Sequence, residues 1–247
     1  MRLQNKVAVV TASTRGIGAA IVETFTKEGA KVYMAVRNLE KAQEMAERLN
    51  AEGGQVYCVY NDATKQETYK TMIEEVAQKE GRIDILVNNY GGSDPRKDLD
   101  IKLTTYEDFI QTLDQNIGSV FIASQAVIPH MAKNGGGSII NISSVWGNVG
   151  ASCEVAYSAC KGGINSLTRA LGKELAPSNI QVNAIACGVI DTDMNRCFSE
   201  EERSALIEEI PAGRMGSPEE VASLAYSLAT ASSYLNGQIL TLDGGWI

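Results

Sequence analysis

The sequence has few of the residues on which disulfide frameworks, zinc sites and histidine-based triads depend. Its five cysteines, among 247 residues, are scattered and form no C-x-x-C pair. Neither a structural zinc site nor a disulfide framework is therefore expected, and a reducing cytoplasm fits best. The only histidine, His130, follows Pro129 near the end of an apolar helical stretch, and we interpret it as structural. A triad that uses histidine is excluded unless His130 is its base.

Long apolar runs and clusters of basic residues are also missing. No segment is apolar over the length that a membrane span requires, and residues 1–6 run into a strand-like segment without the pattern of a signal peptide. The formal net charge is −8 and the pI is about 4.9, with no run rich in Lys or Arg. These features argue against nucleic acid and membranes as partners and favour a cytoplasmic location.

Strand-like and helix-like segments alternate along the whole chain. Short apolar runs predict strands at residues 6–11, 31–36, 55–60, 83–87, 138–142, 180–185 and 238–242. Helices are expected from the first glycine loop to residue 27 and at residues 39–51, 66–79, 106–133 and 154–175. Without a linker or repeat, this order predicts one domain over residues 1–247. It is an α/β Rossmann-type fold, a doubly wound parallel sheet of about seven strands with helices on both faces. Ligands are expected beyond the carboxyl ends of the strands.

A glycine-rich loop, Thr11–Gly18, follows the first strand and opens the first helix. Its glycines would bring backbone amides close to a pyrophosphate at the helix N-terminus. An NAD enzyme would carry an acidic residue about 20 residues further on, at the end of the second strand. That strand instead ends in Val36-Arg37-Asn38, and Arg15 lies in the loop. Two guanidinium groups suit a 2′-phosphate, so NADP(H) is expected and NAD(H) is less favoured. The alternative interpretation is two solvated surface arginines.

Tyr157 and Lys161 lie four residues apart in a predicted helix and therefore on one of its faces. A phenol whose pKa is near about 10 is a poor acid or base at neutral pH. A neighbouring ammonium would stabilise the phenolate and lower that pKa. The spacing also occurs by chance on solvated helices, so its weight depends on the residues around it.

Four elements together resemble the classical short-chain dehydrogenase/reductase family. They are the loop Thr11–Gly18, the segment Asn88-Asn89-x-Gly91, Ser144 thirteen residues before Tyr157, and Tyr157-x-x-x-Lys161. The resemblance covers essentially the whole chain, down to Leu242-Asp243-Gly244-Gly245-Trp246. It implies an NADP(H)-dependent oxidoreductase that interconverts a secondary alcohol and a ketone by hydride transfer.

The resemblance also implies roles for single residues. Tyr157 would be the acid in ketone reduction and the base in alcohol oxidation. Lys161 would lower its pKa and hold the nicotinamide ribose. Ser144 would bind the substrate oxygen, and Asn116 would support a proton-relay water beside the lysine. The expected catalytic residues are Asn116, Ser144, Tyr157 and Lys161.

The binding residues that the resemblance implies come from loops after several strands. Asp62 would contact the adenine, Asn89 the adenosine ribose region, and Ile190 with Thr192 the nicotinamide carboxamide. The expected cofactor-binding set is Ser13, Thr14, Arg15, Ile17, Arg37, Asn38, Asp62, Ala63, Asn89, Tyr157, Lys161, Ile190 and Thr192. The expected substrate-binding set is Ser144, Trp146, Glu154 and Tyr157, and no metal is expected.

Three residues depart from the family pattern without removing a catalytic group. Ala12 replaces the first glycine of the loop, which requires that this backbone tolerate a Cβ. Cys187 stands where the family has proline before Gly188, and Tyr90 replaces a small residue after the paired asparagines. These departures affect geometry rather than chemistry.

Two subgroups of the family compete for the substrate assignment. Residues 13–18, 82–92 and 128–131 resemble bacterial 7α-hydroxysteroid dehydrogenases that act on bile acids, and Tyr90 makes that match more than generic. Residues 238–246 resemble 3-oxoacyl-carrier-protein reductases. A hydroxysteroid is expected, with a carrier-bound 3-oxoacyl group or another small carbonyl compound as alternatives. Trp146 and Glu154 do not follow the hydroxysteroid pattern, and Trp146 either lines the substrate site or only packs.

Charge distinguishes the carrier-protein alternative. Those reductases hold an acidic carrier with arginines beside the site entrance, whereas the matching positions here are Gly135 and Ser178. Carrier docking is therefore not expected. The charged segment Met194–Arg214 is expected to form a lid over the substrate.

The sequence also bears on the oligomeric state and on two other classes of protein. The family resemblance suggests a homotetramer built on the helices that begin near Tyr106 and Glu154. A nucleotide-binding regulator that has lost the chemistry is disfavoured because Ser144, Tyr157 and Lys161 are all present. A lyase or epimerase on this scaffold would need an extended substrate domain, for which the length leaves no room.

Overall fold

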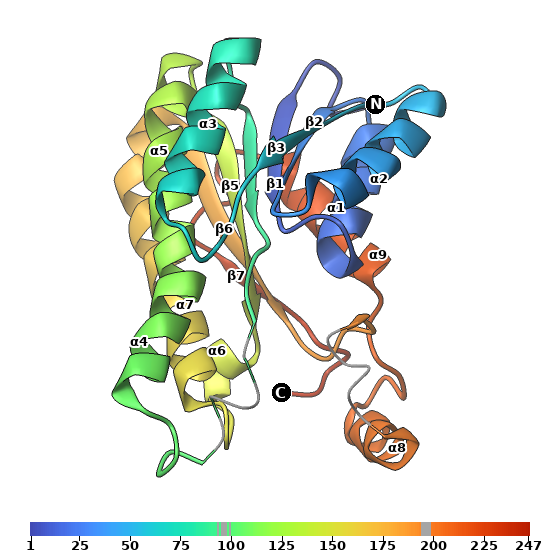
Figure 1. Ribbon diagram of the computed structural model, residues 1–247, viewed down its shortest axis with the longest axis vertical. Coiled ribbons are helices and arrows are strands. Elements are labelled where there is room, and N and C mark those ends of the chain that lie inside the picture. The colour runs from blue at the N-terminus through green and yellow to red at the C-terminus, as the bar shows by residue number, and fades with distance from the viewer. Residues whose placement is uncertain (93, 95–97, 99, 194–198) are drawn as a thin grey trace.

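The computed structural model describes residues 1–92, 94, 98, 100–193 and 199–247 (Figure 1). Seven parallel strands form one sheet in the order β3-β2-β1-β4-β5-β6-β7. The strands are β1 (Val7–Thr11), β2 (Lys31–Val36), β3 (Gln55–Tyr60), β4 (Ile85–Asn88), β5 (Gly137–Ser144), β6 (Ile180–Cys187) and β7 (Ile239–Leu242). The predicted α/β doubly wound fold is therefore confirmed.

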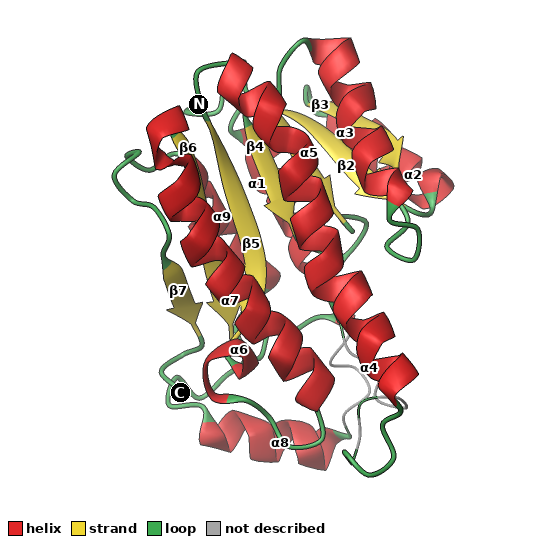
Figure 2. Ribbon diagram, turned by 90° about the vertical axis from the view of Figure 1, so that its left-hand side faces the viewer, coloured by secondary structure: helices red, strands yellow, loops and turns green. Residues whose placement is uncertain are grey.

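Helices cover both faces of this sheet (Figures 1 and 2). One face carries α1 (Gly16–Lys27), α2 (Leu39–Ala51) and α9 (Pro218–Ala229). The other carries α3 (Glu67–Glu80), α5 (Ser119–Lys133) and α7 (Val155–Leu175). Because both faces are covered, the strands are apolar at successive positions rather than at alternate ones, and all five residues of β1 are buried. Val10 packs into one core and its neighbour Val9 into the other.

The strand order reverses between β1 and β4. In an open parallel sheet such a reversal leaves a crevice outside the carboxyl ends of the strands, where ligands bind. The shorter helices α4 (Tyr106–Leu113), α6 (Trp146–Val149) and α8 (Glu200–Glu209) lie toward this edge, as does the C-terminus. Among the described residues, no helix has the length and apolar character needed to cross a membrane.

Several local features differ from the sequence prediction. Strand β4 spans Ile85–Asn88 rather than residues 83–87, and β5 and β6 extend further than predicted, to residues 144 and 187. The helix expected over residues 106–133 is interrupted by a π-helical turn, η1 (Asp114–Gly118), which separates α4 from α5. An inserted residue in one turn hardly disturbs the apolar pattern on either side, so the sequence did not indicate it. The short helix α6 was also not predicted, and its four residues contain no buried side chain.

Candidate active site

The expected catalytic pair lies at the N-terminal end of α7. Tyr157 is the third residue of this helix, and Lys161 follows one turn later with only 2% of its surface exposed. The Lys161 ammonium donates a hydrogen bond to the Ile142 carbonyl (2.9 Å) and lies 5.3 Å from the centre of the Tyr157 ring. The helix and β5 therefore bring the predicted pair together, with the ammonium over the ring face.

Ser144 is the last residue of β5, directly at the carboxyl edge of the sheet. Its Oγ accepts a hydrogen bond from the Trp146 backbone (3.2 Å), and its hydroxyl also hydrogen-bonds the Tyr157 phenol. Ser143 points elsewhere, since its hydroxyl donates to the Asn165 side chain (2.7 Å). Ser144, rather than its neighbour, thus shares the site with Tyr157, as the spacing predicted.

The electrostatics of Tyr157 depend mainly on burial and on Glu154. Burial raises the pKa of its phenol, and the Glu154 carboxylate raises this pKa further, while the Ser144 hydroxyl opposes both. Lys161 is not among the groups that shift the Tyr157 pKa in this arrangement, where its ammonium donates to the Ile142 carbonyl and lies over the ring face; its expected effect on the tyrosine stays a prediction. Burial also lowers the pKa of Lys161 to about 8.

Asn116 lies in the π-helical turn and is buried. Its amide donates to the Gly92 and Thr112 carbonyls (3.0 and 2.9 Å), and its Oδ1 accepts from Gly92 N (3.0 Å). A Cβ on Gly91 would lie 2.7 Å from Lys161 Nζ and 3.1 Å from Asn116 Oδ1. The loop after β4 therefore passes close to both side chains, and a residue larger than glycine at position 91 would displace the Lys161 ammonium.

Asp98 also reaches this site, and no sequence signal identified it. Its buried carboxylate accepts hydrogen bonds from the backbone amides of Ala156 (3.0 Å) and Tyr157 (2.8 Å). The residue that caps α7, Glu154, makes no side-chain capping bond. Asp98 therefore satisfies two unpaired amides at the helix N-terminus, where a negative charge is also favoured by the helix dipole.

The glycine loop forms a tight cradle at the N-terminus of α1. Gly16 has φ of 52°, and a Cβ on Gly18 would lie 2.6 Å from Asn89 Nδ2 and 2.7 Å from the Ala12 carbonyl. The first turn of α1 holds no acidic side chain, and its N-cap makes no side-chain bond. Ala12 has a left-handed backbone conformation, with φ of 52°. Alanine at this position is therefore strained, because a Cβ disfavours the left-handed backbone conformation.

Asn89 holds the glycine loop in place, and its expected contact with the adenosine ribose region stays a prediction. Its side-chain amide donates to the carbonyls of Thr11 and Ala12 (3.0 and 3.1 Å), and its backbone amide donates to Thr11 Oγ1 (2.9 Å). These bonds tie the end of β4 to the glycine loop. The structure therefore shows Asn89 shaping the cradle.

The residues expected around the adenosine lie at the ends of β2 and β3. Arg37 is exposed, and Asn38 caps α2 by accepting from Lys41 N (3.1 Å). Burial would raise the pKa of Asp62, but hydrogen bonds from Thr64 and the Arg37 charge outweigh it and leave this pKa below its ordinary value. Asp62 is thus a buried carboxylate at the cofactor edge.

Among the other expected cofactor residues, Arg15 is exposed, with its guanidinium 3.9 Å from the Asp193 carboxylate. Thr192 approaches the glycine loop, because a Cβ on Gly16 would lie 3.3 Å from its methyl group. Buried Ile190 pairs with Gly216 in an isolated bridge. The remaining expected residues lie in or next to the loops after β1 and β3: Ser13, Thr14, Ile17 and Ala63.

The expected substrate side carries aromatic and acidic groups. The Trp146 and Trp246 rings pack edge to face, with centroids 5.1 Å apart. Trp246 was recognised only as part of the terminal motif. Glu154 is half-buried, and burial together with the Asp98 charge raises its pKa. A protonated Glu154 would remove its repulsion of a Tyr157 phenolate.

The expected lid is described in part, because residues 194–198 lie outside the described chain. Its helix α8 begins with a capping box between Ser199 and Glu202 and contains no buried residue. Arg203 pairs with Asp191 (2.9 Å), which ties α8 to the loop after β6. Figure 2 shows α8 crossing the carboxyl edge of the sheet, below α6 and α7.

Gly135 and Ser178, the positions that match the carrier-binding arginines, lie away from Ser144 and Tyr157. Gly135 precedes β5, whereas Ser144 ends it, and an eight-residue strand separates such positions by roughly 25 Å. Ser178 follows the C-terminal end of α7, whereas Tyr157 is at its start. Within one chain neither residue flanks the candidate entrance, so their lack of charge does not exclude a carrier protein there.

Comparisons with known proteins agree with this geometry. A short-chain dehydrogenase family model, described as enoyl-(acyl carrier protein) reductase, matches residues 11–247. A 7alpha-hydroxysteroid dehydrogenase of Clostridium sardiniense is 42% identical over 247 residues, covering 99% of this chain and 94% of that protein. A 3-oxoacyl-(acyl-carrier-protein) reductase of Thermotoga maritima is 38% identical, with both chains fully covered.

A solved structure, that of gox2181, superposes with a TM-score of 0.94 at 33% identity, covering 99% of this chain and 96% of that one. Fold, family model and full-length relatives thus point to one assignment. The chain belongs to the short-chain dehydrogenase/reductase family and is an oxidoreductase that acts on CH–OH groups.

Proposed function

We propose that this protein interconverts a secondary alcohol and a ketone with NADP(H), and that Tyr157 is its acid and base. The observation that carries the proposal is the meeting of three groups at one sheet edge. The Ser144 hydroxyl, the Tyr157 phenol and the Lys161 ammonium lie beyond the carboxyl end of β5, on the edge that also carries the glycine cradle.

The residues present fit a nicotinamide dinucleotide. Gly18 leaves no space for a Cβ, and the free N-terminus of α1 suits a pyrophosphate. Arg37 and Arg15 are exposed at the adenosine side, where no acidic residue ends β2, and this supports NADP(H) over NAD(H). When bound, the nicotinamide supplies or accepts the hydride.

The protein groups position the substrate oxygen and move its proton. Ser144 hydrogen-bonds the oxygen, and in the direction of reduction Tyr157 donates a proton to it. In the direction of oxidation the phenolate accepts that proton. The Lys161 ammonium and the Asn116 amide oxygen both lie close to Gly91, and we infer that they extend the proton path from Tyr157. Such positioned proton transfer contributes roughly 10²–10⁴-fold to a rate.

A hydroxysteroid is the proposed substrate. The relative from Clostridium sardiniense is a 7alpha-hydroxysteroid dehydrogenase, and the similarity covers almost the whole of both chains. The Trp146–Trp246 pair provides an apolar aromatic surface near Ser144, suited to a fused-ring compound. We also infer a cytoplasmic location from the scattered cysteines and the acidic surface.

The test is a spectrophotometric assay of the purified protein with NADP⁺ or NAD⁺ against a panel of bile acids. Faster oxidation of one hydroxysteroid with NADP⁺ is the expected result. Replacing Arg37 with Asp should raise the KM for NADP⁺ at least roughly 10-fold and lower that for NAD⁺, since a charge-assisted contact with the 2′-phosphate is lost and a carboxylate that can bind the ribose 2′-hydroxyl is gained. An equal preference for both cofactors in the unmodified enzyme would contradict the NADP(H) assignment.

Reduction of a carrier-bound 3-oxoacyl group is the second candidate. The Thermotoga maritima relative carries that name and is covered completely, and the position of Gly135 and Ser178 removes the earlier objection. A short acetoacetyl thioester with NADPH therefore belongs in the same assay. Turnover of the thioester alone would replace the hydroxysteroid assignment.

A further inference from the structure

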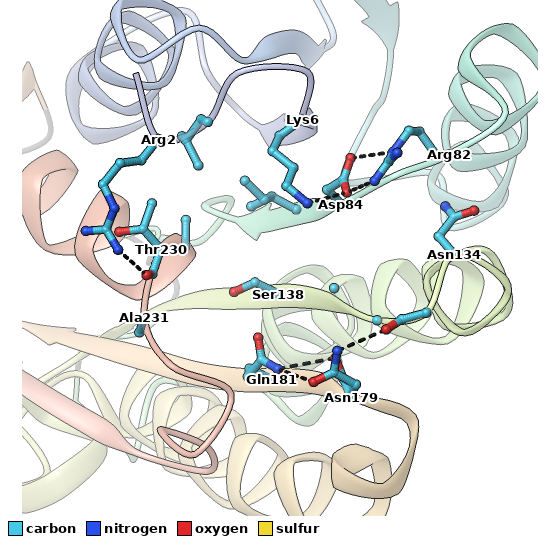
Figure 3. Close-up of a pocket in the computed structure, with 16 residues that line it drawn as sticks. Arg2, Lys6, Arg82, Asp84, Asn134, Ser138, Asn179, Gln181, Thr230 and Ala231 are labelled. Carbon is cyan, nitrogen blue, oxygen red and sulfur yellow. Dashed lines mark hydrogen bonds and ion pairs between the residues drawn. The ribbon is translucent and has the colours of Figure 1, made fainter.

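A pocket lies at the opposite edge of the sheet from Tyr157 (Figure 3). It is formed where β1, β4, β5 and β6 begin, together with the loop that follows α9. Its volume is about 340 Å³, within the range of small-molecule sites. Nothing in the proposed reaction uses it, because the strands separate it from Ser144.

The charge of this pocket contrasts with that of the whole protein. Arg2, Lys6 and Arg82 line it, with Asp84 as the one acidic lining residue. Asp84 accepts from Arg82 Nε (2.9 Å), from Lys6 Nζ (3.2 Å) and from Val7 N (2.9 Å), which holds the pKa of this carboxyl below its ordinary value. A lining of three cations and one anion leaves a positive surplus in a chain of net charge −8.

Two polar side-chain atoms at the pocket are buried without a partner. Within the described part of the chain, Ser138 Oγ and Asn134 Nδ2 have no hydrogen-bond partner, and Ser138 is only 4% exposed. Its backbone amide donates to the Asp84 carbonyl (2.9 Å), which fixes the start of β5 against the start of β4. Because buried polar groups are nearly always paired, these two atoms indicate a missing partner that accepts hydrogen bonds.

The opposite wall is rigid. Asn179 Nδ2 donates to the Gly135 carbonyl (2.9 Å), and Gly137 N donates to the Asn179 carbonyl (3.2 Å). A Cβ on Gly136 would collide with the Asn179 backbone carbonyl, so only glycine allows this close approach. Figure 3 shows Arg2, Lys6 and Arg82 on one side of the pocket, and Ser138, Asn179 and Gln181 on the other.

We propose that this pocket binds a small organic oxyanion, a phosphate ester or a carboxylate. The oxyanion would accept from the Ser138 hydroxyl and the Asn134 amide, and its charge would be balanced by Arg2 and Lys6. A small ligand fits better than a protein surface because the pocket is concave and its unpaired atoms are buried. The proposal does not depend on the substrate or cofactor assignment.

The test is isothermal titration calorimetry with inorganic phosphate and, separately, with succinate, in chloride buffer. Saturating NADP⁺ is present so that phosphate does not bind at the glycine loop. Ser138→Ala removes only the unpaired hydroxyl, and Arg2→Gln removes one cation. Lys70→Gln, an exposed lysine in the first turn of α3 at the other edge, is the charge-matched control.

Binding of phosphate or succinate that Ser138→Ala weakens roughly 10-fold is the expected result, because a hydrogen bond to a charged group is lost. Arg2→Gln should also weaken it, whereas Lys70→Gln should not. Tighter binding of phosphate would identify phosphate esters as the ligand class, and tighter binding of succinate would identify carboxylates. No binding of either probe, unchanged binding by Ser138→Ala, or an equal loss with Lys70→Gln would each overturn the proposal.

Discussion

The phenol of Tyr157 is harder to deprotonate in this arrangement than in water, because burial and Glu154 both raise its pKa. A neutral phenol suits proton donation to a ketone. Proton acceptance from an alcohol requires one of two changes. Either Lys161 moves from the Ile142 carbonyl toward the hydroxyl, or Glu154 becomes protonated, and burial with the Asp98 charge already raises the pKa of Glu154.

Replacing Tyr157 with Phe removes the proposed acid and keeps the ring. Turnover should fall roughly 10²–10⁴-fold, while NADPH affinity, measured by fluorescence titration, should stay nearly unchanged. The matched control is Tyr234→Phe, which removes the same hydroxyl from a residue that is 98% exposed. Retention of most activity by Tyr157→Phe would mean that another group supplies the proton.

Ala12 has a left-handed backbone with a Cβ, which costs about 1–2 kcal/mol relative to glycine. Ala12→Gly should therefore raise the free energy of unfolding by about 0.5–1 kcal/mol, after the greater freedom of glycine in the unfolded chain is subtracted. Urea unfolding measures this change. The control is Ala51→Gly at the exposed end of α2, where the same substitution should destabilise the protein by about 0.5–1 kcal/mol. A loss of stability in both variants would show that Ala12 is not strained.

Helix α7 depends on an acidic residue 58 positions before its N2 amide. Asp98 accepts from Ala156 N and Tyr157 N, so the backbone of the proposed catalytic residue is held by the loop after β4. Similar placement applies to Asn116, whose π-helical turn lets its side chain reach both Gly92 and Thr112. The loop that carries Asp98 therefore positions the start of α7, and the π-helical turn positions the Asn116 side chain.

Asp98→Asn should weaken this anchor, because an amide can accept through one oxygen and its NH₂ opposes a backbone N–H. We expect a loss of about 1–2 kcal/mol in unfolding free energy and a lower kcat with little change in the KM for NADPH. The Glu154 pKa should also fall, since a like charge nearby is removed, and carboxyl NMR can follow its titration.

Asp100→Asn is the control for this anchor. Asp100 is exposed, and its carboxylate accepts only a local bond from Lys102 N (2.9 Å) among the bonds described, so stability and kcat should hardly change. An unchanged Glu154 titration in Asp98→Asn would contradict the electrostatic part of the explanation, even if stability fell.

Apolar runs and helical periodicity predicted several elements well. The strands at residues 31–36 and 55–60 and the helix at 39–51 have the predicted ends. Hydrogen bonds between segments far apart in the chain could not be predicted from the sequence, because they depend on tertiary contacts. Asp98 reaches α7 across 58 residues, and Asn89 turns to the glycine loop across 77. Nor could spacing give the orientation of Lys161, which the Ile142 carbonyl decides.

The arrangement of the layers leaves an apolar stripe on the chain from residue 103 to 121. Leu103, Tyr106, Ile110 and Phe121 are exposed by 73%, 72%, 43% and 49%, and they lie on or beside α4 and α5, on one face of the sheet. Exposed apolar side chains that form a contiguous patch commonly mark a site of contact with another protein. Burial between subunits would remove them from water.

We therefore expect a homotetramer in sedimentation equilibrium, with four chains of 26.5 kDa each. Phe121→Asp should shift the equilibrium toward smaller species, because it would place a charge in an apolar interface. Tyr234→Asp, on a side chain that is 98% exposed outside these helices, should leave the mass unchanged. Circular dichroism of both variants separates dissociation from unfolding. A stable monomer of the unmodified protein at micromolar concentration would contradict the tetramer, and the stripe would then need another partner.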